Sequence, residues 1–162
     1  MAIEYRPFGP ETENTTMSNS YKSEDEIEAV VHGFESCATP DSGFTHRAHV
    51  TVAVWYLFRV TPSESLLQMR ASIFRFLDHH HVGLEKYNET LTVFWLKLVR
   101  QQMHELGAEC SLLEATNAII QSLGNSQVVF DYYTRERLWS DEARRAWVEP
   151  DLKQLKAPAG CD

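Results

Sequence analysis

The chain has 162 residues, of which 43% are hydrophobic, so it is long enough for one domain with a substantial core. Its 15 basic and 23 acidic residues give a formal net charge of −8, and without a Lys/Arg cluster this charge argues against a nucleic-acid partner. Three widely spaced cysteines, no signal-peptide pattern and no apolar run of about 18 residues predict a soluble cytoplasmic protein without disulfides or membrane contact.

The N-terminal segment is predicted to lie outside the core. Residues 1–22 show neither a helical nor a strand period and combine Pro, Gly, Ser, Thr and acidic residues, which is typical of a flexible leader. Ser23 and Glu26 then fit a capping box that opens a first helix. We therefore expect a helical domain over 23–155 and a flexible tail over 156–162.

The segment 44–60 is apolar on almost every side after its first turn, which predicts a helix at the centre of the core. A cap from Ser42 or Thr45 would open it. Its first turn carries His46 and His49, which are three residues apart and share one helix face. Two imidazoles are therefore expected at the mouth of the core.

A third helix is predicted after this central one. Thr61, Pro62 and Glu64 supply a cap, a proline at the first helical position and the acidic partner of a capping box. Gly83 is the expected C-terminal stop. Of the histidines at the end of this helix, His80 continues the buried stripe best, with His81 on the flank.

The fourth predicted helix runs from about Asn88 to Gly107, and its broad apolar arc makes it a second central helix. Ser111 and Glu114 fit the capping box of a fifth. The helical period also places six large aromatic residues in the core, namely Trp55, Phe58, Phe74, Phe76, Phe94 and Trp95.

The C-terminal part adds one short helix. Residues 128–133 fit either a helix or a strand, and Ser140 caps a last helix that Pro150 ends. Because nothing else alternates in polarity, the predicted fold is all-α, a single-domain bundle of about five antiparallel helices plus a short C-terminal helix.

The expected topology brings titratable side chains together. Short connections make consecutive helices antiparallel, so the start of the second, the end of the third, the start of the fourth and the end of the fifth share one end of the bundle. We call this end the histidine pole. The side chains expected there are His46, His49, His80, Tyr87, Glu89 and Asp131.

Parts of the pattern resemble a set of uncharacterised small all-helical bacterial proteins. The shared residues are Phe44-x-His46-x-x-His49, Lys86-Tyr87-x-Glu89-Thr90-x-Thr92, Ser140-x-x-Ala143-Arg144 and Pro150-Asp151-Leu152, within residues 24–152. The set usually reads Tyr-His-Glu-Thr at the second motif, whereas this chain has Asn88 in place of the histidine. The resemblance supports these positions but implies no particular reaction.

Two functional classes follow from the histidine pole. In the first, His46, His49 and His80 with Glu89 bind a divalent metal such as Zn, Fe or Mn, while Tyr87 or Asp131 donates a proton; a metal-free version pairs a histidine general base with Glu89. In the second, the protein is a non-catalytic module for a small molecule or a protein partner. Glu89 also has a purely structural explanation, since an acid in a first helical turn favours the helix dipole.

Overall fold

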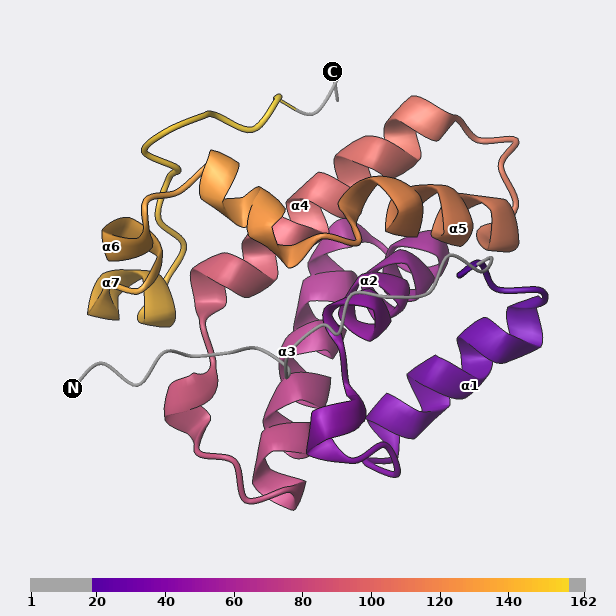
Figure 1. Cartoon of the computed structure of the whole chain (residues 1–162), viewed down its shortest axis with the longest axis horizontal. Helices are drawn as coiled ribbons and strands as arrows, with labels where there is room; N and C mark the ends of the chain where they lie inside the picture. The colour runs from indigo at the N-terminus through magenta and orange to yellow at the C-terminus, as the bar shows by residue number, and fades with distance from the viewer. Residues whose placement is uncertain (1–18, 158–162) are drawn as a thin grey trace.

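The computed structural model describes residues 19–157, and over this range the chain forms the predicted all-α bundle (Figure 1). The main helices are α1 (Glu24–Glu35), α2 (His46–Arg59), α3 (Pro62–His79), α4 (Glu89–Leu106), α5 (Leu112–Leu123), α6 (Arg135–Leu138) and α7 (Asp141–Arg145). Short 3-10 turns join them: η1 (Asp41–Gly43), η2 (Leu84–Lys86) and η3 (Ser126–Asp131). Within this range, no helix is both long and apolar enough to cross a membrane.

Helix α2 occupies the centre of the bundle, as its apolar sequence predicts. It contacts α1, α3, α4 and α5, which surround it in Figure 1. Val52 and Val54 point in nearly opposite directions on a helix, yet both are fully buried. The expected packing of α2 against α4 is confirmed, and Trp95 of α4 is buried with its ring against His46 of α2.

Most predicted helix starts are confirmed by their caps. Capping boxes form at Thr61 with Glu64 and at Ser111 with Glu114, and the Thr45 hydroxyl accepts from the Ala48 N–H at 3.2 Å. The box expected at the start of α1 is wrong. There the serine side chain makes no cap hydrogen bond, and the Glu26 carboxylate instead accepts from the Lys22 N–H at 2.7 Å.

The end of α3 differs from the prediction. The helix ends at His79, four residues before the glycine expected to stop it. His81 adopts the left-handed conformation with a φ of 54°, and the Val82 N–H donates to the Leu77 carbonyl at 2.9 Å. This is a C-cap of the type that glycine usually forms, and histidine is among the residues that tolerate it.

The domain begins earlier than residue 23. The Tyr21 side chain is buried, and its hydroxyl lies 3.0 Å from the Thr51 Oγ1. The Tyr21 N–H donates to Asn117 Oδ1 at 2.8 Å, and the Asn117 amide donates back to the Tyr21 carbonyl at 3.0 Å. A single anchoring residue has no period, which is why the sequence pattern missed it. The rest of the predicted leader, 1–18, and residues 158–162 lie outside the described range.

Two of the six aromatic residues expected in the core are exposed. Phe58 and Phe74 have 44% and 39% of their surface accessible, whereas Phe76, Phe94 and Trp95 are buried. The helical period identifies the apolar face of a helix, but it does not show where the neighbouring helices stop covering that face. Phe74 instead packs its ring on Tyr87, with centroids 4.6 Å apart.

The C-terminal segment closes the bundle beside α4. Residues 126–131 form the 3-10 turn η3 rather than a strand, the Ser140 cap of α7 is confirmed, and α6 was not predicted. Tyr133 is fully buried and donates its hydroxyl hydrogen to the Val148 carbonyl at 2.8 Å. The chain that follows α7 is thereby fixed to the core.

Trp95→Ala should lower the free energy of unfolding by ~3 to 5 kcal/mol, because it removes a buried ring from the contact between α2 and α4. Trp55→Ala should cost less, about 1 to 2 kcal/mol, because Trp55 is only half-buried and its ring is covered by the Arg59 guanidinium at 3.3 Å. Urea unfolding of both variants measures the difference. Equal costs would contradict the central position of α4.

Candidate functional site

Glu89 is the first residue of α4 and is bound from two directions. Arg70, in the middle of α3, donates from Nε to Glu89 Oε2 at 3.0 Å and from Nη2 to Oε1. The Tyr87 hydroxyl donates to Oε2 at 2.5 Å. Glu89 is only 8% exposed, so this three-residue group, which we call the Glu89 cluster, ties α3 to the start of α4 below the surface.

The electrostatics of the Glu89 cluster favour a fixed charge pair. Burial alone would raise the pKa of Glu89, but the hydrogen bonds from Arg70 and Tyr87 outweigh burial and lower the pKa below its usual value. Burial and the neighbouring carboxylate raise the pKa of Tyr87. At neutral pH the carboxylate is therefore ionised and the phenol is protonated, and neither group has a pKa suited to proton transfer near pH 7.

His46 is anchored in the interior. Its Nε2 lies 2.9 Å from the Leu123 carbonyl, which places the start of α2 beside the end of α5. Because a carbonyl only accepts, Nε2 carries the hydrogen in this contact. The imidazole also packs on the Trp95 ring, with centroids 4.5 Å apart, and the residue is buried. These contacts hold the ring in one orientation.

His49 lies one turn further along α2. Its ring packs near Phe44, with centroids 5.5 Å apart. Burial lowers the pKa of His49 to about 3, and the nearby charge of protonated His46 acts in the same direction. The imidazole is therefore neutral at physiological pH and is a weak base there.

His80 caps the C-terminal end of α3. Its ring packs on Phe76 and His79, with centroid distances of 4.4 Å and 4.9 Å, and its Nε2 is buried without a hydrogen-bond partner among residues 19–157. Arg70 precedes it by ten residues on the same helix, a separation of about 15 Å along the axis. The Glu89 cluster, which is bound to Arg70, thus contacts α3 well before the level of His80.

The structure brings only part of the predicted set together. Tyr87 joins Glu89, and His46 lies near His49, whereas Asp131 is exposed at the end of η3. Over the described range, no three His, Cys, Asp or Glu side chains form a group that could hold a metal ion. The metal site and its Zn, Fe or Mn ion therefore stay a prediction.

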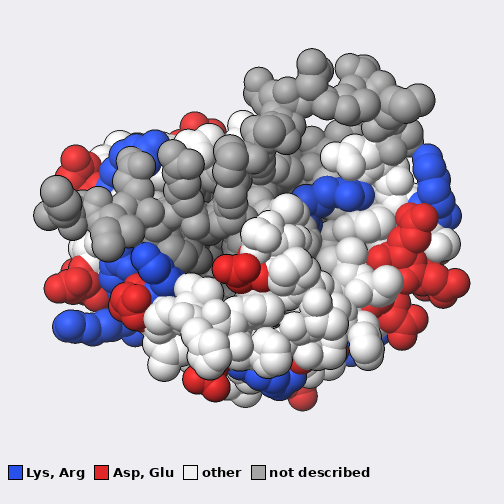
Figure 2. Space-filling model, turned by 60° about the horizontal axis from the view of Figure 1, so that its bottom comes forward, with Lys and Arg blue, Asp and Glu red and all other residues white. Residues whose placement is uncertain are grey.

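Figure 2, in which the lower side of Figure 1 comes forward, shows an area without Lys, Arg, Asp or Glu between separate charged groups.

Arg70, which the sequence pattern did not identify as a site residue, is the partner of Glu89. The sequence does contain a signal for Arg70. It lies one helical turn after Leu66 and one turn before Ile73, which places a charged side chain at the edge of a buried stripe.

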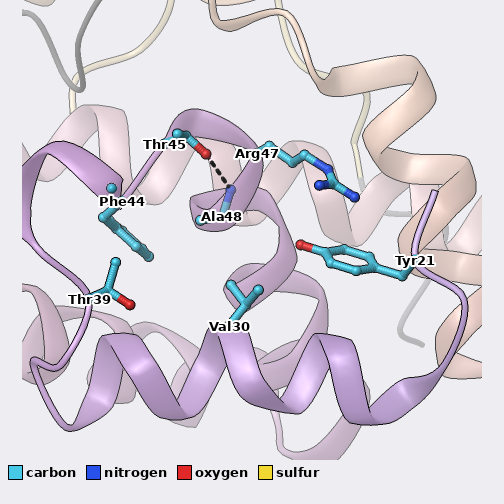
Figure 3. A pocket seen from close by; sticks show the side chains of 8 residues that line it. Tyr21, Val30, Thr39, Phe44, Thr45, Arg47 and Ala48 are labelled. Atoms are coloured by element: carbon cyan, nitrogen blue, oxygen red, sulfur yellow. Dashed lines mark hydrogen bonds between the residues drawn. The ribbon is translucent and has the colours of Figure 1, made fainter. Parts of the chain in front are cut away.

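A separate pocket of about 180 Å³ lies between α1 and the start of α2 (Figure 3). None of the six predicted site residues lines it. Arg47 and Tyr21 form one side, where the Arg47 guanidinium lies over the Tyr21 ring at 4.2 Å. The residues that line the pocket are Tyr21, Val30, Thr39, Gly43, Phe44, Thr45, Arg47 and Ala48.

Comparison with protein-family models, with curated proteins and with solved structures finds no match for this chain.

Glu89→Gln should lower the free energy of unfolding by about 2 to 3 kcal/mol at pH 7, because the Arg70 charge loses its buried partner. The pKa of Glu89 is lower in the folded protein than in the unfolded chain, where it is about 4.3. The stabilisation is therefore fully present above about pH 4.3 and is lost as the pH falls through the pKa of Glu89 in the folded protein. Denaturation curves at pH 7 and pH 3 measure both effects. Glu114→Gln, at the exposed start of α5, is the control and should cost much less than Glu89→Gln.

The lowered pKa of His49 predicts a second dependence of stability on pH, at higher pH values than that of Glu89. The unfolded chain binds a proton at His49 below about pH 6.5, whereas the folded chain does so only near pH 3, so stability falls as the pH decreases from 6.5. Between pH 7 and pH 5 the native protein should lose about 1 to 2 kcal/mol more than His49→Gln does. His32→Gln, at an exposed histidine, should behave like the native protein. An identical loss in all three would show that His49 is solvated.

Proposed function

We propose that this protein is a non-catalytic binding module that holds a small molecule in the pocket between α1 and the start of α2. The observation that carries the proposal is the pocket itself, in which apolar walls from Val30, Phe44 and Ala48 face the hydroxyl-bearing Thr39 and the cationic Arg47. Small-molecule sites combine apolar walls with a few polar groups in this way.

The lining chemistry supports binding rather than catalysis. Among the residues that the structure describes, no His, Cys, Asp or Glu side chain lines the pocket. A general acid or base works best with a pKa near the operating pH, whereas the pKa of His49 is about 3 and that of Glu89 is held below its usual value. The acid–base alternative therefore has less support than the binding alternative.

The walls of the pocket are fixed before a ligand arrives. Phe44 stacks on Phe34 with centroids 4.1 Å apart and planes within 6° of parallel. Tyr21 is held through its hydroxyl by Thr51 and through its backbone by Asn117. A preorganised site loses little conformational entropy on binding, which favours affinity for a ligand with few contacts.

The volume of the pocket limits the size of the ligand. At about 180 Å³, the pocket is smaller than the ~300 to 1,000 Å³ typical of sites for drug-sized molecules. The expected ligand is therefore a molecule with few non-hydrogen atoms.

A fragment titration tests this function. Equal numbers of anionic, neutral and cationic fragments of that size are added to the full chain, and the methyl signals of Val30 and Ala48 are followed by NMR. We expect saturable shifts at both methyl groups with at least one fragment. Ala48→Leu should abolish these shifts by filling the pocket, whereas Ala71→Leu, at an exposed position on α3, should leave them unchanged. No saturable shift with any fragment, or unchanged binding to Ala48→Leu, would contradict the proposal.

A further inference from the structure

We infer that the ligand of the pocket is a short-chain monocarboxylate, and that Arg47 binds its carboxylate group. This inference rests on the proposed function and specifies its ligand class. Within residues 19–157, Arg47 is the one charged residue that lines the pocket. A ligand held in a small space against a single guanidinium has to accept hydrogen bonds, and it gains most if it is negatively charged.

The charge of Arg47 is not neutralised by the described part of the protein. Nη2 donates to the Asn19 carbonyl at 2.6 Å, and the guanidinium lies over the Tyr21 ring, but both partners are uncharged. The ion pairs within residues 19–157 involve Arg70, Arg137 and Lys156 instead. The Arg47 Nε is buried there without a hydrogen-bond acceptor. A guanidinium has five N–H donors, so donors remain for a carboxylate.

The start of α2 adds to this positive potential. Thr45 is its N-cap, and both Thr45 and Ala48 line the pocket, so the first turn of a 14-residue helix faces the same space. That first turn contains no acidic residue. The positive end of the helix dipole and the Arg47 charge therefore act in the same direction, and an anion gains from both.

The walls select the type of anion. Val30, Phe44 and Ala48 present hydrocarbon to the space next to the cation. An inorganic anion would have to shed water against these walls without a polar partner on that side, which is unfavourable. A carboxylate with a short alkyl chain puts its charge on Arg47 and its methylene groups on the walls, where each buried CH₂ is favourable.

Butyrate is the probe that tests this inference, with butyramide as its neutral isostere, butylammonium as the cation and inorganic phosphate as the anion without an apolar part. Titrations of the full chain at constant ionic strength follow the Val30 and Ala48 methyl signals. We expect butyrate to bind at least tenfold more tightly than each of the other three. Arg47→Gln should weaken butyrate at least tenfold and leave butyramide unchanged.

The matched control is Arg135→Gln. Arg135 also lies over an aromatic ring, that of Phe130, at 4.2 Å, but it does not line the pocket, so butyrate should bind this variant as it binds the native chain. Equal binding of butyrate and butyramide, or of butyrate and phosphate, would overturn the monocarboxylate assignment while the pocket still bound a ligand. Undiminished butyrate binding to Arg47→Gln would overturn the role of Arg47. If the pocket binds no small molecule at all, no fragment shifts either methyl signal. That result would contradict the proposed function and is distinct from the outcomes above.

Discussion

The structure depends on the burial of one helix on nearly all its sides. Helix α2 contacts four other helices, so Val50, Val52, Ala53, Val54 and Tyr56 are removed from water together. Such a helix can meet solvent and ligands only near its ends. The first turn of α2 carries Arg47 on a different face from His46 and His49, and the neighbours of each face decide what each side chain can do. The two histidines turn toward the interior, and the arginine turns toward a pocket.

The sequence predicted most of the fold because the determinants of that fold are local. The capping boxes at Thr61 and Ser111, and the glycine that ends α4, act within one helical turn and formed as expected. Two errors were local: the Ser23 side chain makes no cap hydrogen bond, and His81 rather than a glycine is the left-handed residue after α3. Tyr21 was missed because it joins the core through partners 30 and 96 residues away.

The candidate site was harder to predict for the same reason. Antiparallel topology correctly predicted that the start of α2 lies beside the end of α5. It could not predict which part of α3 the start of α4 would contact. Glu89 contacts α3 at Arg70, and Arg70 satisfies its carboxylate. Each histidine likewise has its own neighbours: the Leu123 carbonyl and Trp95 for His46, Phe44 for His49, and Phe76 for His80. The buried polar groups of His46 and Glu89 are hydrogen-bonded within the protein, and such pairing competes with convergence on a shared ligand.

We propose that ligand binding belongs to the pocket between α1 and the start of α2, here called the Arg47 pocket, and not to the Glu89 cluster or the histidine pole. A crystal structure of the full chain soaked with butyrate tests this claim most directly. We expect density for butyrate between α1 and the start of α2, with a carboxylate oxygen within about 3 Å of an Arg47 nitrogen and the alkyl chain against Phe44 and Val30. Butyrate bound at Arg70 or His80, with the Arg47 pocket empty, would contradict it.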